Sequence, residues 1–286
     1  MAADENLLHD QTNILPKKRL IVVFAALASA LLITYIDQNS IGVVLPTIGQ
    51  DLNSTSTIVW AGTASLIANT AFQVLYGRLS DIFGRKVILL VCLCLLALAD
   101  LLCGFTQTGP QLYAFRGIAG VANGGIMALT MMIVSDVTTL EMRGKYQGIL
   151  GSCVGLGNTI GPFIAAGFTK GTTWRATFWF ICPLSVCVAI ILFFLLPPAT
   201  IPPGPLRNKL RNIDYAGILL SSSGNILLLI PVSGIKTQFR ASSPLTIAML
   251  TLGSTLLVLF VVNEWKWARL PFLPCKLPSM QTRSPC

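Results

Sequence analysis

The stretch GRLSDIFGRK, from Gly77 to Lys86, holds four charged residues in a chain of which only 11% is charged. Long apolar runs lie on both sides of it, IVWAGTASLIANTAFQVLY at 58–76 and VILLVCLCLLALADLLCGF at 87–105. A helix needs about 20 mostly apolar residues to cross the ~30 Å hydrocarbon core of a bilayer. The stretch therefore predicts a short polar connection between two membrane-spanning helices.

Apolar runs of this length recur along the chain, and 53% of its residues are hydrophobic. They do not show the alternation of apolar and polar residues, over about 10 residues, that marks a membrane β-barrel strand. We therefore predict an all-α, polytopic membrane protein with eight spanning helices, at residues 20–45, 58–76, 87–106, 111–134, 148–168, 175–196, 214–232 and 245–263.

The net charge of +9 follows the connections between these helices. With the N-terminus placed in the cytoplasm, fifteen Lys and Arg residues lie on the cytoplasmic side and four on the opposite side, while Arg116 lies inside a helix. An excess of Lys and Arg in cytoplasmic segments is the usual orientation signal of membrane proteins. The sequence therefore predicts that both termini are cytoplasmic, and the basic charge needs no nucleic-acid partner.

The predicted helices divide the chain into a cytoplasmic tail (1–19), a six-helix unit (20–196), a proline-rich basic linker (197–213), two further helices (214–263) and a second cytoplasmic tail (264–286). The one histidine lies in the first tail, and six of the eight cysteines lie in apolar runs. This leaves no histidine-based metal site or catalytic triad. We predict no metal, no cofactor and no enzymatic activity.

Three ionisable residues, Asp37, Asp100 and Arg116, fall inside apolar runs, where charge is costly and frequently functional. Counting residues along the helices places all three in the outer half of the bilayer. Arg116 can neutralise only one of the two carboxylates, so the other is a candidate to hold a proton. A static ion pair between helices is the alternative interpretation. Asp100 lies near enough to the outer end that we expect water to reach it, and a structural role is the other alternative for this residue.

Two features belong to the predicted outer side. Asn53, Ser54 and Thr55 form an N-glycosylation sequon in the first outer loop, so Asn53 is a candidate glycosylation site. Trp174 and Arg175 lie at the outer mouth of the sixth helix. Because aromatic residues gather at membrane interfaces, we expect this pair to anchor the helix there.

Several of these segments together resemble a known family. GRLSDIFGRKVIL resembles the signature between helices two and three of the major facilitator superfamily, and LYAFRGIAGVANGG resembles its helix-four motif, with Arg116 and Gly120 as fixed points. GILGSCVGLGNTIGPFIAAGF is similar to the helix-five antiporter motif. YIDQNSIGVVLPTIGQDL resembles the helix-one motif of the fourteen-helix drug:proton antiporter branch. Residues 213–274 look like the two extra helices of that branch, in its fungal multidrug and vacuolar basic amino-acid transporter forms.

The resemblance implies a fold and an activity. It implies a six-helix N-terminal bundle of the major facilitator fold, followed by two additional transmembrane helices. It also implies proton-coupled export of small molecules such as drugs or amino acids across a plasma or vacuolar membrane. Under this interpretation Asp37, Arg116 and Asp100 couple transport to protons, and the partners are the substrate, protons and the lipid bilayer.

The charged stretch acquires a specific role from the resemblance. Family members are thought to lock their outward-facing state through an Asp–Arg–Asp cluster, which here is Asp81, Arg85 and Asp136. Gly77 and Gly84 permit the tight turn and the close helix approach. We therefore predict a cytoplasmic gate formed by these five residues, with topology alone as the alternative role of the charges.

The fifth helix carries two small-xxx-small patterns, Gly151 with Gly155 and Gly157 with Gly161, which allow close backbone contact. Pro162 is expected to kink the helix or loosen its hydrogen bonding. Packing alone explains these residues, and the resemblance adds that this helix limits proton leak in antiporters. The segment does not follow a strand, so it is not a dinucleotide fingerprint.

The chain departs from the family in one respect. Superfamily members enclose a central site between two six-helix halves, whereas this sequence matches one half and two further helices. We expect that a monomer of the chain does not transport, and we favour a truncated gene product. A half-transporter that dimerises, and a non-transporting fragment or regulatory subunit of a full-length relative, are the alternatives.

Overall fold

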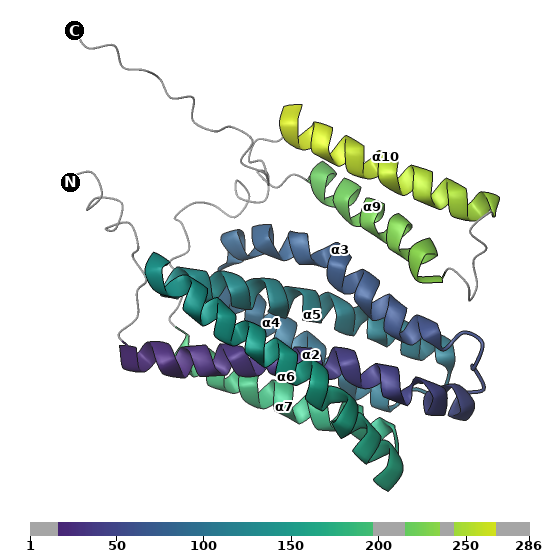
Figure 1. Ribbon diagram of the computed structural model, residues 1–286, viewed down its shortest axis with the longest axis horizontal. Helices are drawn as coiled ribbons and strands as arrows, with labels where there is room; N and C mark the ends of the chain where they lie inside the picture. Colours follow the sequence, from purple (N-terminus) through teal and green to yellow (C-terminus); the bar gives the residue numbers. More distant parts are fainter. Residues whose placement is uncertain (1–16, 197–214, 235–242, 267–286) are drawn as a thin grey trace. The chain divides into compact units, whose positions relative to one another are not determined.

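The computed structural model describes residues 17–196, 215–234 and 243–266. Within those ranges it is entirely helical, with helices separated by short turns and no strand, which confirms the predicted all-α fold class. The helices are α2 (Lys17–Asp51), α3 (Val59–Phe83), α4 (Arg85–Gly104), α5 (Gly109–Val137), α6 (Leu140–Gly171), α7 (Arg175–Leu195), α9 (Tyr215–Gly234) and α10 (Pro244–Lys266) (Figure 1). The predicted linker, most of the N-terminal tail and most of the C-terminal tail lie outside the described residues.

The chain divides into two compact units, Met1–Pro202 and Pro203–Cys286. The first contains α2 to α7 and the second contains α9 and α10. In the first unit α3 packs mainly on α5, α2 packs mainly on α6, and α4 packs on both α5 and α7. These pairings form a six-helix bundle in which long, nearly antiparallel helices lie side by side (Figure 1).

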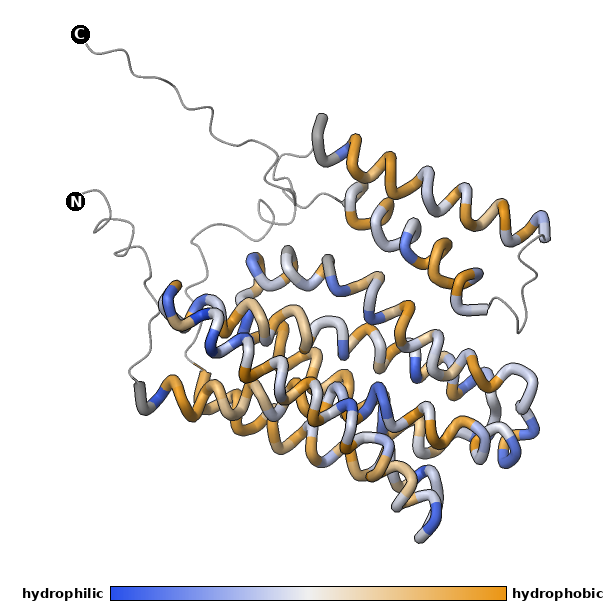
Figure 2. Tube along the Cα trace, viewed as in Figure 1, coloured by the Kyte–Doolittle hydropathy of each residue, from blue (hydrophilic) through white to orange (hydrophobic). Residues whose placement is uncertain are grey.

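Seven of the described helices are long and apolar enough to cross a membrane, and α3 is the exception. Each of the eight predicted spans nevertheless corresponds to a described helix, and α3, with 25 residues, packs within the bundle on α5. Polar residues recur along α3, and Figure 2 shows the resulting hydrophilic positions. Ser65 and Asn69 of this helix are buried. Polar side chains that face other helices lower the mean hydropathy of α3 without exposing those groups to lipid.

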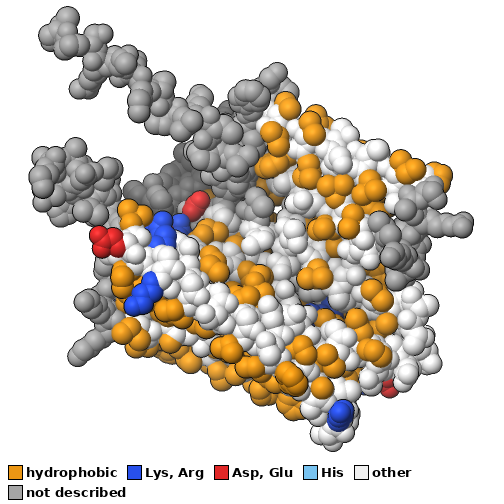
Figure 3. All heavy atoms as spheres, viewed as in Figure 1, with side chains coloured by type: hydrophobic (Ala, Val, Ile, Leu, Met, Phe, Trp, Pro, Cys, Tyr) orange, Lys and Arg blue, Asp and Glu red, His pale blue; other side chains and the backbone are white. Residues whose placement is uncertain are grey.

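The core of the bundle consists of two hydrophobic clusters. The larger includes Leu31, Leu93 and Ile126, and the smaller includes Ile48 and Phe178. On the face of the bundle shown in Figure 3, most of the visible Lys, Arg, Asp and Glu side chains lie near the ends of the helices, and apolar side chains are interspersed with backbone and uncharged polar groups between them. This distribution is typical of helices that present a hydrophobic belt to lipid.

The charged stretch GRLSDIFGRK is almost entirely helical. Helix α3 continues to Phe83 and α4 begins at Arg85, so Gly84 alone separates them. Gly84 has a φ of 88°, in the region that glycine adopts readily and other L-residues avoid. Its N–H donates a hydrogen bond of 2.9 Å to the carbonyl oxygen of Ser80, closing the last turn of α3. The predicted connection between the two helices is thus a single residue, Gly84.

Two glycines on α5 allow α3 to pack close to its backbone. A Cβ atom at Gly120 would lie 2.2 Å from the carbonyl oxygen of Ser65, and one at Gly124 would lie 2.6 Å from that of Asn69. Spaced four residues apart, the two glycines occupy one face of the helix. Helix α3 can therefore reach the backbone of α5, as in small-xxx-small contacts between membrane helices.

Glycines also allow close backbone contact between α6 and α2, which we call a glycine seam. Cβ atoms at Gly157 and Gly161 would lie 3.1 Å from Leu32 O and 2.9 Å from Ile36 O. The hydroxyl of Ser40 donates across the same seam to the carbonyl oxygen of Gly161. The other predicted glycine pair of α6, Gly151 and Gly155, makes no such contact, because added Cβ atoms there would have no described atom within 4 Å. Helix α6 continues through Pro162.

The second unit repeats the same packing device. A Cβ atom at Gly224 of α9 would lie 2.9 Å from the Leu257 side chain, and one at Gly253 of α10 would lie 3.1 Å from the carbonyl oxygen of Gly224. The two helices therefore pack through facing glycines, backbone against backbone.

We predict that Gly120→Leu destabilises the bundle strongly and that Gly117→Leu, on the same helix, does not. The larger side chain at Gly120 would overlap the backbone of α3, whereas a Cβ atom at Gly117 has no described atom within 4 Å. Thermal unfolding of the purified protein in detergent measures the difference. Equal loss of stability in the two variants would contradict the assigned helix contact.

Candidate functional site

Three helices place ionisable side chains together in the middle of the bundle. Arg116 of α5 donates from Nη1 to Asp37 Oδ1 of α2 at 2.5 Å, and the same nitrogen lies 3.7 Å from Asp100 Oδ1 of α4. All three side chains are 0% exposed. We call these residues the ionic cluster. The structure therefore brings together the three intramembrane charges that the sequence singled out.

The ionic cluster separates the two hydrophobic clusters of the core. On each helix the ionisable residue lies between a member of one cluster and a member of the other: Ile36 and Ile41 on α2, Ala99 and Cys103 on α4, and Leu112 and Ala119 on α5. The expectation that water reaches Asp100 is wrong, because this side chain is fully buried. Helix α7 covers the region, with Phe178 of the smaller cluster packed near Arg116.

Two residues that the sequence analysis missed complete the surroundings of the ionic cluster. Asn123 of α5 donates from Nδ2 to Asp37 Oδ2 at 2.7 Å. The guanidinium of Arg116 lies over the ring of Phe178, with 5.8 Å from Cζ to the ring centre, a cation–π distance. Asn123 follows Arg116 by seven residues, or two helical turns, so both lie on the same face of α5. This spacing is the sequence feature from which Asn123 could have been predicted.

The two carboxylates of the ionic cluster have different surroundings. Asp37 accepts hydrogen bonds from Arg116 and Asn123, whereas neither oxygen of Asp100 has a hydrogen-bond partner among the described residues. Arg116 also keeps Nε and Nη2 without partners there. Two acids and one base leave one negative charge uncompensated when both acids ionise. A buried, unpaired charge is expensive, so the arrangement is suited to binding one proton.

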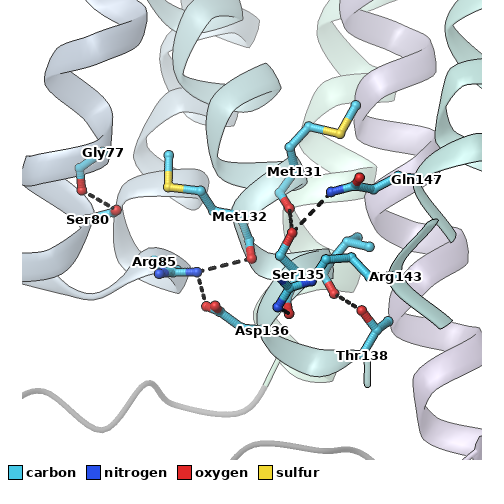
Figure 4. Close-up of polar contacts among 11 residues, drawn as sticks. Gly77, Ser80, Arg85, Met131, Met132, Ser135, Asp136, Thr138, Arg143 and Gln147 are labelled. Atoms are coloured by element: carbon cyan, nitrogen blue, oxygen red, sulfur yellow. Dashed lines mark hydrogen bonds and ion pairs between the residues drawn. The ribbon is translucent and has the colours of Figure 1, made fainter. Parts of the chain in front are cut away.

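A second polar group forms at the predicted cytoplasmic end. Arg85 makes an ion pair with Asp136, and its Nη1 also donates to the carbonyl oxygen of Met132 at 3.0 Å (Figure 4). The nearby Arg143 donates to the carbonyl oxygen of Ser135 at 2.8 Å. Both cations thus bind carbonyl groups in the last turns of α5, where the helix dipole favours positive charge.

Not all of the expected gate residues meet. Asp81 lies on α3, one turn before Arg85, is exposed, and makes no ion pair with another described side chain. Gly84 connects α3 to α4, while Gly77 has only the methyl end of Met132, at 3.8 Å, near its added Cβ. Of the predicted Asp–Arg–Asp cluster, the structure therefore joins Arg85 and Asp136 directly and leaves Asp81 outside the contact.

A third set of polar contacts lies at the other end of the bundle, where it joins the C-terminal end of α2 to the N-terminal end of α7. Trp174 Nε1 and Arg175 Nη1 donate to Asp51 Oδ2 at 3.0 and 2.7 Å, and Arg175 Nη2 donates to the carbonyl oxygen of Thr106 at 3.1 Å. Trp174 is only 3% exposed. The pair expected to anchor the helix at the interface therefore also ties the ends of α2 and α7 together, through Asp51, which the sequence analysis did not single out.

Asn53 lies two residues beyond the end of α2 and is exposed. Its φ of 49° is a left-handed conformation, which asparagine tolerates better than most residues. Within the described ranges no group of three or more His, Cys, Asp and Glu side chains is arranged to hold a metal ion.

Comparison with known proteins gives consistent matches over most of the chain. A sequence profile of the Major Facilitator Superfamily matches residues 27–267. The chain is 50% identical over 270 residues to Citrate exporter 1 of Yarrowia lipolytica, covering 94% of this chain and 40% of that protein. It is 40% identical to MFS-type transporter clz4 of Cochliobolus lunatus, covering 93% and 48%, and 33% identical to Efflux pump dotC of Dothistroma septosporum, covering 95% and 46%.

Solved structures support the fold. The POT family transporter PepTSo superposes with a TM-score of 0.60 at 15% identity, covering 86% of this chain and 52% of that structure. A D-xylose-proton symporter gives a TM-score of 0.55 at 16% identity, covering 86% and 67%. The chain spans less than half the length of the three fungal relatives.

We predict that the buried Asp37–Arg116 pair contributes more to stability than the Asp51–Arg175 pair, whose side chains are 46% and 27% exposed. Breaking a buried pair by removing one partner costs about 3–5 kcal/mol, whereas exposed pairs contribute about 0.2–1 kcal/mol. Double-mutant cycles with Asp37→Asn and Arg116→Gln, and with Asp51→Asn and Arg175→Gln, measure both couplings. A larger coupling for the Asp51–Arg175 pair would contradict the assignment.

Proposed function

The chain belongs to the Major Facilitator Superfamily, and on that premise we propose that it supplies the proton-coupling bundle of a small-molecule exporter. One observation carries the proposal: a fully buried cluster holds two carboxylates and one guanidinium. A purely structural ion pair would be balanced by one acid and one base. The additional acid gives the bundle a group whose charge depends on proton binding.

The proposed mechanism is exchange of protons for substrate. A proton entering from the outer side neutralises the surplus carboxylate of the ionic cluster, and its loss to the cytoplasm restores the charge. Each change alters the attraction between Arg116 and the carboxylates of α2 and α4. Because these side chains come from three different helices, the change in attraction acts on the packing of α2, α4 and α5 together.

The cytoplasmic gate is proposed to rest on Arg85 and Asp136. Their ion pair joins the start of α4 to the end of α5, and Gly84 places this contact directly after α3. Opening of the cytoplasmic side would separate the pair and expose both charges to water. Asp81 is exposed and one turn away, so in this proposal it meets Arg85 only after a shift of α3 about Gly84.

The substrate class follows from the relatives. Their names describe export of citrate and efflux by pumps, and we take a small organic anion such as citrate as the first substrate to test. The face between α2 and α6 offers amide groups for such a ligand. Asn39 Nδ2 donates to Asn158 Oδ1 at 2.7 Å, at an exposed position. Drugs and amino acids, which the motif resemblance implies, are the next candidates.

The wider assignment is proposed on the same basis. The helix-one motif and the additional helices α9 and α10 support the fourteen-helix drug:proton antiporter branch. We propose that both termini face the cytoplasm, in a plasma or vacuolar membrane. Transport by alternating access requires a second bundle opposite α2–α7, which a longer protein, a full-length relative or a second copy of the chain would provide.

We predict that transport depends on the proton gradient through the ionic cluster, and that this coupling requires Asp37 as a partner of Arg116. The test uses a chimera in which this chain replaces the matching segment of the citrate exporter, which supplies the rest of a transporter. In proteoliposomes, an imposed proton gradient should accelerate citrate exchange by the chimera. Asp37→Asn should remove that acceleration, while Asp51→Asn, a charge change outside the ionic cluster, should preserve it.

Two results would contradict the proposal. One is citrate exchange by the chimera that is indifferent to the gradient. The other is gradient-driven exchange that survives Asp37→Asn. The purified chain reconstituted alone, at densities that allow two copies to associate, tests in parallel whether a second copy can provide the opposing bundle.

A further inference from the structure

The two carboxylates of the ionic cluster are not equivalent, and the difference identifies which of them binds the proton. Asp37 has a donor on each oxygen, Arg116 Nη1 at 2.5 Å and Asn123 Nδ2 at 2.7 Å. Hydrogen bonds to the charged form of a carboxylate favour that form. The ionised state of Asp37 is therefore already satisfied within the bundle.

Asp100 has the opposite surroundings. Its side chain is 0% exposed, and both of its oxygens lack a hydrogen-bond partner among the described residues. The positive charge nearest to it is Arg116 Nη1, at 3.7 Å, and that nitrogen is already bound to Asp37. Burial without hydrogen bonds penalises the charged form of a carboxylic acid. The described arrangement is thus one in which Asp100 is stable with a proton bound.

The other charged and titratable groups around Asp100 support this reading. Asp37 of α2 adds a negative charge that opposes a second one, and Arg116 of α5 is the single cation in the described cluster. Two cysteines are also near Asp100: Cys103, which is buried one turn along the same helix, and Cys182 of α7, which is partly buried. Thiols in apolar surroundings are neutral, so they do not compensate an ionised Asp100.

We propose that Asp100 carries the coupling proton while Asp37 remains ionised as the fixed counter-ion of Arg116. A hydronium ion from the outer water transfers its proton to an Asp100 oxygen, forming the O–H bond and leaving water. On release the proton passes back to water, and the O–H electron pair remains on the carboxylate. This assignment rests on the proposed proton coupling and names the residue that performs it.

The spare donors of Arg116 give the release step a structural consequence. Nε and Nη2 of Arg116 and both oxygens of Asp100 lack hydrogen-bond partners in the described part of the chain. Once ionised, Asp100 can accept hydrogen bonds from these nitrogens, and charge-assisted bonds of this kind are short and strong. Loss of the proton therefore draws α4 toward Arg116 of α5, whereas binding of the proton releases it.

Infrared spectroscopy of the purified chain in lipid nanodiscs tests the assignment without requiring transport. At neutral pH the chain should show the C=O stretching band of a protonated carboxyl group. Asp100→Asn should remove this band, because Asp37 and Arg116 then balance each other. Asp100→Glu should shift the frequency of the band, whereas Asp37→Glu should leave it in place, because the residue that holds the proton sets the frequency. Asp51→Asn, which changes a partly exposed carboxylate, is the control that should leave the band unchanged.

Folding of the variants is checked alongside. Asp100→Asn has the shape of the protonated acid and should keep the thermal stability of the parent chain. Asp37→Asn alone leaves Arg116 with Asp100 as its only carboxylate, so Asp100 should ionise and the band should disappear. The pair Asp37→Asn/Arg116→Gln removes both charges together and should still show the band. Loss of the band in this double variant, its persistence in Asp100→Asn, or a frequency shift in Asp37→Glu rather than in Asp100→Glu would overturn the assignment.

The infrared spectra and the transport assay test different claims, so one claim can be refuted while the other stands. A chimera without proton-driven exchange would refute the proposed function even if the Asp100 band is present. A proton-coupled chimera in which the band is absent from the chain would refute the role of Asp100 and leave the proposed function intact.

Discussion

An arginine buried between two hydrophobic clusters must be neutralised, and this constraint governs the α2–α7 bundle. Arg116 is fully buried and finds its partner on another helix, Asp37 of α2. In a low-dielectric interior an unpaired charge of this kind would cost several kcal/mol. The pairing consequently fixes the depth of α2 against α5, and α4 is included because Asp100 faces the same guanidinium.

Glycine contacts allow the helices to approach closely enough for that pairing. Gly120 and Gly124 bring α3 against α5, and Gly157 and Gly161 bring α6 against α2. Helices α2 and α5, which carry Asp37 and Arg116, thus each make a close backbone contact with a further helix, α6 and α3 respectively. The ion pairs at the two ends, Arg85 with Asp136 and Arg175 with Asp51, close the bundle above and below the ionic cluster.

The sequence predicted the helices and the membership of the ionic cluster because apolar length and residue counting report depth in a bilayer. They do not report the direction in which a side chain points. For this reason the burial of Asp100, the donor Asn123 and the separation of Asp81 from Arg85 and Asp136 required the structure. The same limit applies to α6, where one glycine pair forms a seam and the other lies open. The hydrogen bond between Trp174 and Asp51 also required the structure, because the two residues are distant in the sequence.

The most direct test of this account is a pair of experimental structures of the chain, determined at acidic and alkaline pH by cryo-electron microscopy with a bound antibody fragment. The account predicts that the contact between Asp37 and Arg116 is the same in both structures. It also predicts that Asp100 lies apart from Arg116 at acidic pH and accepts its hydrogen bonds at alkaline pH. A structure in which Asp37 separates from Arg116 while Asp100 stays in place would contradict it.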